Sequence, residues 1–140
     1  MNPTLAALTG FVTWTLLLLV LMEGIRTKLV VTKAVPANGF TPDNANLSPF
    51  MQRLARAHAN CLEGLPVFGG LMVICLIAGK SSISDPFAYV FLTARIVQSV
   101  IHLWSVSPTA VTLRFAAFAI QMGIGAYWAV RLLSAIAARP

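Results

Sequence analysis

The chain has 140 residues, of which 58% are hydrophobic and 10% are charged, with a formal net charge of +6. Its mean hydropathy is +0.81. A soluble domain carries about 25% charged residues. Because this chain is small and strongly apolar, it could not hide its apolar surface from water, and its composition excludes a water-soluble domain. The ten Lys and Arg residues are scattered and mostly flank or enter apolar runs, which argues against nucleic acid as a partner.

Four apolar segments are each long enough to cross a bilayer, which takes about 20 residues. The apolar run of the first segment follows a start without basic residues and continues to Met22, where Glu23 follows and not a small-residue cleavage site. We therefore interpret this segment as a retained membrane helix and not as a cleaved signal peptide. No linker is long enough to divide the chain, and a single domain is expected. The sequence therefore predicts an all-α integral membrane protein whose lipid-embedded spans cover residues 4–31, 48–79, 85–105 and 109–138.

Turn residues and capping pairs separate these spans. Residues 32–47 contain prolines, asparagines and a glycine, which break helices. The pairs Ser48-Pro49 and Asp85-Pro86 each place a capping residue before a proline, and this order is typical of a helix start. Because the three links are short, we expect sequential helices to be antiparallel neighbours in a four-helix bundle.

The basic residues predict the orientation of the bundle in the membrane. Five of them cluster around the first link, namely Arg26, Lys28, Lys33, Arg53 and Arg56. The second link has Lys80 alone, and the third link has none. Since cytoplasmic loops carry the excess of Lys and Arg, we expect the first and third links in the cytoplasm and both termini outside it.

One polar stripe runs along the second span. Arg53, Arg56, Asn60 and Glu63 are spaced by three, four and three residues. At 100° per residue they share one face about 80° wide. Ionisable residues inside a membrane are costly, so this stripe is a functional-site hypothesis. It predicts a face that meets another helix or a water-filled cavity.

The third span repeats the pattern with Arg95, Gln98, Ser99 and His102. Counted from Asp85, Arg95 lies about 15 Å into its helix, close to the middle of a hydrocarbon core about 30 Å thick. Glu63 is the only acidic residue available at that depth. We therefore predict a Glu63–Arg95 ion pair, with a structural role favoured over a catalytic one.

The fourth span carries Arg114 near its beginning and Gln121 seven residues later. Arg53, Arg56 and Arg114 could instead be interfacial anchors that extend to lipid phosphates.

Cys61 and Cys75 are roughly 21 Å apart along one helix, too far for a disulfide. No metal site is predicted.

The run from Arg53 to Glu63 resembles the hallmark of the MAPEG family, the membrane-associated proteins in eicosanoid and glutathione metabolism. The hallmark is roughly Arg-x-x-Arg-x-His-x-Asn-x-x-Glu, followed by a proline and an aromatic residue, here Pro66 and Phe68. The resemblance covers nearly the whole chain and is strongest to the small bacterial members. It implies an inner-membrane homotrimer that binds glutathione near the cytoplasmic side, between neighbouring subunits.

The resemblance also implies roles for individual residues. Arg56 and Arg26 would hold carboxylates of glutathione through charge-assisted bonds, Glu63 its ammonium group, and Asn60 its peptide groups. Arg114 would be the catalytic residue that stabilises the thiolate. The glutathione site predicted in this way consists of Arg26, Arg56, Asn60, Glu63, Gln98 and His102.

The chain departs from the prostaglandin synthase of this family at several positions. Ala59, Gln98, His102 and Phe118 stand where that enzyme has an arginine, a histidine and two tyrosines, which argues against prostaglandin synthesis. The polar stripes favour a glutathione-dependent transferase or peroxidase acting on lipophilic electrophiles or lipid hydroperoxides. The missing tyrosines favour the alternative, a non-catalytic lipid-binding or partner-assembly protein. A transporter is a weaker third choice, because no internal repeat is visible.

Overall fold

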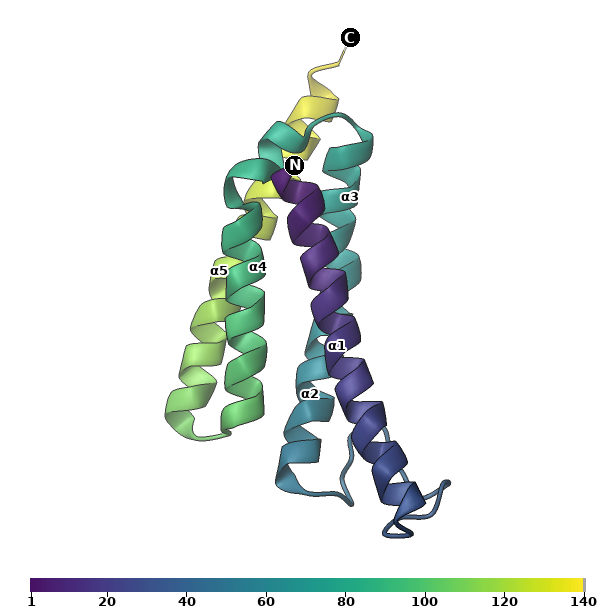
Figure 1. Ribbon diagram of the computed structural model, residues 1–140. Coiled ribbons are helices and arrows are strands. Elements are labelled where there is room, and N and C mark those ends of the chain that lie inside the picture. Colours follow the sequence, from purple (N-terminus) through teal and green to yellow (C-terminus); the bar gives the residue numbers. More distant parts are fainter. Residues whose placement is uncertain (140) are drawn as a thin grey trace.

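The computed structural model describes residues 1–139, and these residues form a bundle of helices (Figure 1). The elements are α1 (Pro3–Val31), α2 (Pro49–Gly64), the π-helical turn η1 (Leu65–Gly69), α3 (Gly70–Ile77), α4 (Ser81–Trp104) and α5 (Pro108–Ala137). Since α2, η1 and α3 follow one another directly, they make one span. Each of the four spans is long and apolar enough to cross a membrane. The predicted all-α four-helix bundle is confirmed.

The predicted helix start at Ser48-Pro49 is confirmed, and α1 and α5 begin in the same way. In α1, α2 and α5 the residue before the first proline accepts a hydrogen bond from the backbone N–H three residues later. That bond satisfies one of the N–H groups that have no partner within the helix. The three capping residues are Asn2, Ser48 and Ser107.

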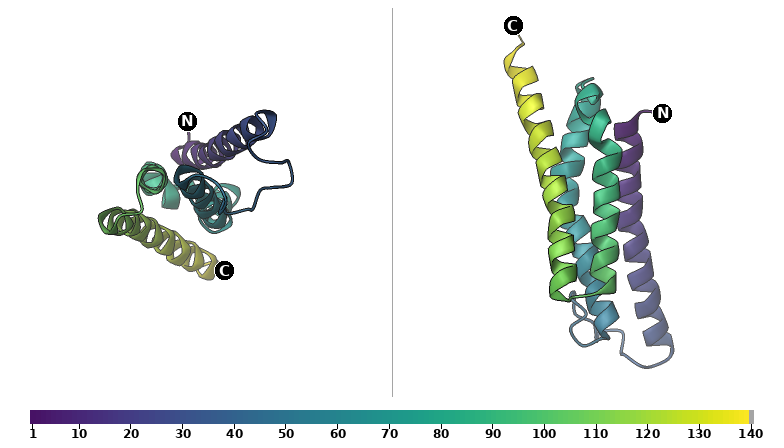
Figure 2. Two further views of the ribbon diagram at one scale, coloured as in Figure 1. Left: turned by 90° about the horizontal axis from the view of Figure 1, so that it is seen from below. Right: turned by 90° about the vertical axis from the view of Figure 1, so that its left-hand side faces the viewer.

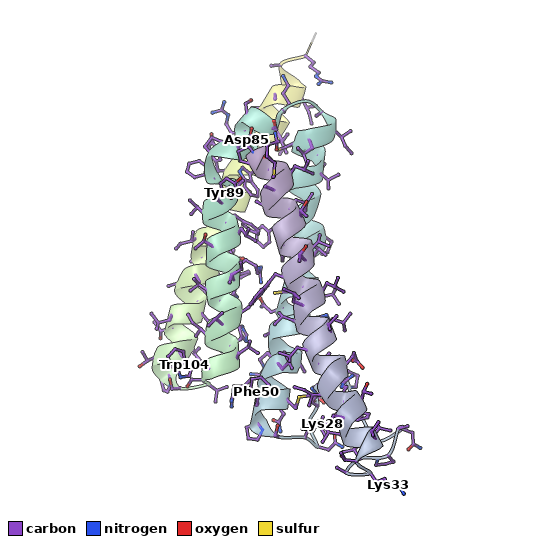
Figure 3. The ribbon with its side chains drawn as sticks, viewed as in Figure 1. Lys28, Lys33, Phe50, Asp85, Tyr89 and Trp104 are labelled. Atoms are coloured by element: carbon purple, nitrogen blue, oxygen red, sulfur yellow. The ribbon has the colours of Figure 1, made fainter. Side chains whose placement is uncertain are left out.

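The predicted start of the third span at Asp85-Pro86 is wrong. The helix α4 begins at Ser81, and Pro86 lies inside it. The Asp85 carboxylate instead accepts hydrogen bonds from the hydroxyl of Thr4 and, at 3.2 Å, from its backbone N–H. Figure 3 shows Asp85 beside the beginning of α1. Because the first turn of a helix has free N–H groups and a partial positive charge, Asp85 caps α1 and not its own helix.

The second span is not the unbroken helix that the sequence predicts. Pro66 has no N–H for the helical hydrogen bond to the preceding turn, and the chain passes this point as the π-helical turn η1. The turn directs Phe68 into the core, with its ring centroid 5.0 Å from that of Phe91. Gly125 on α5 permits this contact, because a Cβ there would lie 2.7 Å from the Phe68 ring.

The helix α4 packs against α1, α2 and α5, whereas α5 packs mainly on α4 (Figure 2). Both termini lie at one end of the bundle, and the 32–48 link and the α4–α5 turn lie at the other (Figure 1). Lys28, Lys33 and Trp104 mark this second end in Figure 3. Long apolar side chains such as Leu16 and Val20 are exposed along the outside of the bundle, which suits a lipid surrounding.

Candidate functional site

A cationic pocket lies at the end of the bundle where α4 turns into α5. It has a volume of about 120 Å³. Three arginines and a histidine line it, and within the described chain none of its lining residues is acidic. Arginine donates paired hydrogen bonds that suit carboxylates, so this pocket favours an anion. Its lining residues are Pro49, Gln52, Arg53, Arg56, His102, Val106 and Arg114.

The short α4–α5 turn brings two of the predicted site residues together. His102 is in the last turn of α4 and Arg114 in the second turn of α5. The Nη1 of Arg114 lies 2.8 Å from Nδ1 of His102, and the imidazole is buried. The predicted site residues Arg56, His102 and Arg114 therefore lie around one pocket.

Arg53 is a pocket residue that the predicted glutathione site omits. Its Nε donates a hydrogen bond of 2.9 Å to the backbone carbonyl of Leu103. The last carbonyls of a helix have no partner within the helix and carry partial negative charge, so a cation there stabilises the end of α4. The spacing places Arg53 in the α2 stripe, on the same face as Arg56, but does not by itself assign it to the site.

The stripe on α2 continues beyond the pocket along the outside of the bundle. Arg56 and Glu63 are exposed, and Asn60 is half-buried. A hollow of about 360 Å³ has Arg56 in its wall, and another of about 300 Å³ has Asn60 and Glu63. Charged side chains at these positions of a membrane span are costly in contact with lipid, so this face calls for a protein or aqueous neighbour.

The predicted Glu63–Arg95 ion pair is not formed. Arg95 is fully buried, and its Nη1 donates to the side-chain and backbone oxygens of Asn60. In residues 1–139 the ion pair found is the one between Arg26 and Glu23. Asn60 and Glu63 are three residues apart, or about 60° around the helix. The inner edge of the stripe reaches Arg95, and Glu63 is on the outer edge.

Two aromatic rings also lie against Arg95. Its guanidinium carbon lies 5.2 Å from the ring centre of Phe11 and 6.0 Å from that of Phe68. Such contacts attract a desolvated cation to the ring face. Gly64 leaves room for the group, since a Cβ there would lie 2.7 Å from Nη2. A buried cation is thus held by one amide, one carbonyl and two rings.

Arg26 is bound within its own chain, at the end of α1. Its Nε and Nη2 both donate to the side-chain oxygen of Asn44, Nη2 also donates to the Thr41 carbonyl, and Nη1 pairs with Glu23 at 2.9 Å. Arg26 is not among the residues that line the cationic pocket. This geometry assigns it to fixing the 32–48 link and does not support its predicted contact with glutathione.

A second local network orders the same link. The Asp43 carboxylate accepts hydrogen bonds from the hydroxyl of Thr41 at 2.8 Å and from the backbone N–H of Ala45 at 3.1 Å. These bonds favour the ionised form and hold the pKa of Asp43 below its usual range. The charged carboxylate thus keeps the turn before Asn44 in one conformation.

Replacing Asn44 by alanine is expected to lower the free energy of unfolding by about 2–3 kcal/mol. Asn44 is fully buried, has a positive φ of 55°, and donates a hydrogen bond of 2.7 Å to the Met51 carbonyl. Alanine loses this bond and the two that Asn44 accepts from Arg26, and it is strained at this φ. Denaturation in mixed detergent micelles measures the change. The exposed Asn38→Ala is the control, and an equal loss in both variants would contradict this role.

Gln98 is bound to α5 and does not line the cationic pocket. It accepts a hydrogen bond of 2.8 Å from the amide of Gln121, and both side chains are buried. On the α2 side of the same helix, the Ser99 hydroxyl lies 3.2 Å from the sulfur of Cys61. The polar residues of α4 therefore serve two purposes, because these contacts join helices whereas His102 faces the pocket.

No curated protein and no solved structure matches the chain. The model of the MAPEG family matches residues 4–134. This match runs from the first turn of α1 to the last turn of α5 and includes the whole α2 stripe. With its four apolar spans, the chain is thus an integral, multi-pass membrane protein. It belongs to the MAPEG family, whose members are associated with glutathione and eicosanoid metabolism.

Proposed function

We propose that the protein is a glutathione-dependent transferase or peroxidase acting on lipophilic electrophiles or lipid hydroperoxides. The observation that carries this proposal is the cationic pocket of Arg53, Arg56, His102 and Arg114, which opens beside the polar stripe of α2. Glutathione has two carboxylates, one ammonium group and a thiol. The pocket and stripe offer cations, an amide and a carboxylate in one continuous region.

Each group of glutathione has a counterpart in this region. Arg56 suits a carboxylate through paired charge-assisted bonds, and Glu63 suits the ammonium group. The side-chain oxygen of Asn60 is occupied by Arg95, so its NH₂ group is what remains to donate to a peptide carbonyl. Arg114 supplies positive charge for the sulfur, since a nearby cation favours the thiolate.

A homotrimer would complete this site. Among the described residues, the lining of the pocket has arginines but no acidic residue for the ammonium group of glutathione, so the pocket alone holds only part of the tripeptide. The exposed Arg56 and Glu63 need cover from another subunit, because lipid does not solvate charges. We propose that glutathione lies between neighbouring subunits. Native mass spectrometry in a mild detergent tests the trimer, and a spectrum with monomers alone would rule it out.

The distribution of basic residues supports a cytoplasmic position for the pocket. The pocket end of the bundle carries Arg26, Lys28, Lys33, Arg53, Arg56 and Arg114, and the other end carries Lys80, Arg131 and Arg139. By the positive-inside rule, the proposed topology has both termini outside the cytoplasm. A bacterial inner membrane is the proposed location.

The proposed chemistry begins with the glutathione thiolate, after the thiol proton has passed to water. In the transferase reaction the sulfur forms a bond to the electrophilic carbon, and the leaving group departs with the electron pair. In the peroxidase reaction the sulfur attacks the terminal peroxide oxygen, and the lipid leaves as an alkoxide that takes up a proton. The sulfenic acid of glutathione then condenses with a second glutathione to give the disulfide and water.

A non-catalytic lipid-binding protein is the second candidate. An open apolar groove of about 440 Å³ between α4 and α5 favours it, as does Phe118 at a position where the prostaglandin synthase of the family has a tyrosine. The groove is lined by Tyr89, Val90, Thr93, Ala94, Val97, Ala117 and Ile120.

One set of measurements on the purified protein in mild detergent distinguishes these candidates. Calorimetry measures glutathione binding, and absorbance measures conjugation of a nitro-activated aryl chloride and reduction of a lipid hydroperoxide. Binding with turnover is the expected result. Binding without turnover of either substrate favours the non-catalytic candidate, and absence of binding overturns the proposed function.

A further inference from the structure

The contact between His102 and Arg114 determines where the imidazole carries its proton. Nδ1 of His102 lies 2.8 Å from Nη1 of Arg114. A guanidinium group has only donors, so Nδ1 must accept this hydrogen bond and carry no proton. The neutral ring therefore has its proton on Nε2, since the bond made by one ring nitrogen sets the state of the other.

The charges around the ring favour this neutral form. Arg114 approaches from α5, Arg53 and Arg56 line the same pocket from α2, and Arg95 lies two turns earlier on α4 itself. Within the described residues, no acidic side chain lines the pocket. A proton added to Nδ1 would set two N–H donors against each other at 2.8 Å and add a fourth positive charge to the pocket wall. His102 is therefore a fixed hydrogen-bond donor.

We propose that the Nε2–H of His102 donates a hydrogen bond to the glutathione sulfur and that Arg114 holds His102 in the tautomer that makes this possible. The inference rests on the proposed function and deepens it. His102 cannot be the base, because Nε2 already has a proton and Nδ1 is occupied by Arg114. The thiol proton therefore passes to water at the open pocket, and His102 stabilises the thiolate that remains.

The aromatic residues that follow Arg114 on α5 cannot provide a hydrogen-bond donor for the sulfur, so the donor must come from another helix. Phe115 and Phe118 follow Arg114 on α5, and neither side chain can donate to sulfur. His102 lines the pocket with its Nδ1 bound, so Nε2–H is the one polar group of the ring that is left for a ligand. Arg114 thus acts as a positioning residue for His102 and as a cation near the sulfur.

The first test needs no glutathione. The chain has two histidines, His58 and His102, so nitrogen NMR of protein labelled at histidine, compared with the His58→Gln variant, assigns both rings. We expect His102 as the neutral Nε2–H tautomer at pH 7 and a mixture of tautomers in Arg114→Leu. An imidazolium, or a proton on Nδ1, would overturn the inference.

The second test titrates the thiolate absorbance of bound glutathione in two variants. In His102→Gln the side-chain NH₂ can replace Nε2–H, whereas His102→Phe has no donor. The Phe variant is expected to raise the pH midpoint of thiolate formation by about one to two units, a tenfold to hundredfold loss. The midpoint in the Gln variant should stay within about half a unit of the parent, or about 0.7 kcal/mol, because its NH₂ group still donates a hydrogen bond to the sulfur.

The outcomes separate the inference from the function on which it rests. If the Gln variant loses as much as the Phe variant, His102 acts as more than a donor, and the inference fails. An unchanged midpoint in the Phe variant also overturns it. Thermal unfolding verifies that both variants fold, and His102→Leu replaces the Phe variant if that side chain is too large. Failure of the unaltered protein to bind glutathione would instead overturn the proposed function.

Discussion

Replacing Asn60 by leucine is expected to lower the free energy of unfolding by about 3 kcal/mol. Arg95 is fully buried, and its Nη1 donates a hydrogen bond to the side-chain oxygen of Asn60. Leucine has a similar volume but no acceptor, so the guanidinium would keep its charge and lose its strongest contact. Reversible denaturation in mixed micelles measures the change.

A double-mutant cycle isolates this interaction. Arg95→Met removes the buried charge and keeps much of the volume, so Asn60→Leu should cost much less in its presence, with a coupling of about 2 kcal/mol. Glu63→Gln is the control partner, because Glu63 is exposed three residues further along the helix. A larger coupling of Arg95 with Glu63 than with Asn60 would restore the ion pair predicted from the sequence.

Replacing Arg114 by alanine is expected to reduce the conjugation rate by about 10²–10³-fold. The variant loses one of the three arginines of the pocket and also the bond that holds the His102 tautomer. Glutathione affinity should fall less, because Arg56 and the rest of the α2 stripe remain. Thiolate absorbance and steady-state conjugation of an aryl halide give the two readings, and size-exclusion chromatography verifies the oligomer.

Arg131→Ala provides the matched control for this experiment. Arg131 is also an arginine of α5, but it lies near the opposite end of the helix, 5.8 Å from the ring centre of Tyr127. Its loss should leave the thiolate and the rate unchanged. If Arg114→Ala conjugates as fast as the parent protein, Arg114 is an interfacial anchor and the thiolate is stabilised elsewhere.

Local sequence signals predicted most of the fold, and the exceptions depend on tertiary contacts. A capping residue before a proline begins α1, α2 and α5, because the cap bond forms within four residues. Asp85-Pro86 has the same local form, yet Asp85 binds Thr4, which is 81 residues away in the sequence. No local pattern reveals that partner. The π-helical turn at Pro66 was missed because the apolar run continues through it unchanged.

Part of the candidate site could be predicted from the sequence as residues on one helix face, but their contacts could not. Periodicity placed Arg56, Asn60 and Glu63 on one face of α2, and the structure agrees. Which edge of that face turns inward depends on how α2 packs against α4, so the partner of Arg95 was assigned incorrectly. The contacts of Arg26 with the 32–48 link could not be predicted for a related reason, because that link has no periodicity to interpret.

The contact between Asp85 and Thr4 has a consequence for the order in which the protein assembles. Thr4 belongs to α1 and Asp85 to α4, so the span that carries Thr4 is synthesised before the span that carries its partner. Until α4 has been inserted beside α1, the backbone N–H of Thr4 lacks this carboxylate partner. The spans of α1 and α2 alone therefore form an incomplete intermediate, and the insertion of α4 supplies the missing contacts. A chain whose synthesis stops before Ser81 would therefore have an α1 helix whose first turn lacks its hydrogen bond to Asp85.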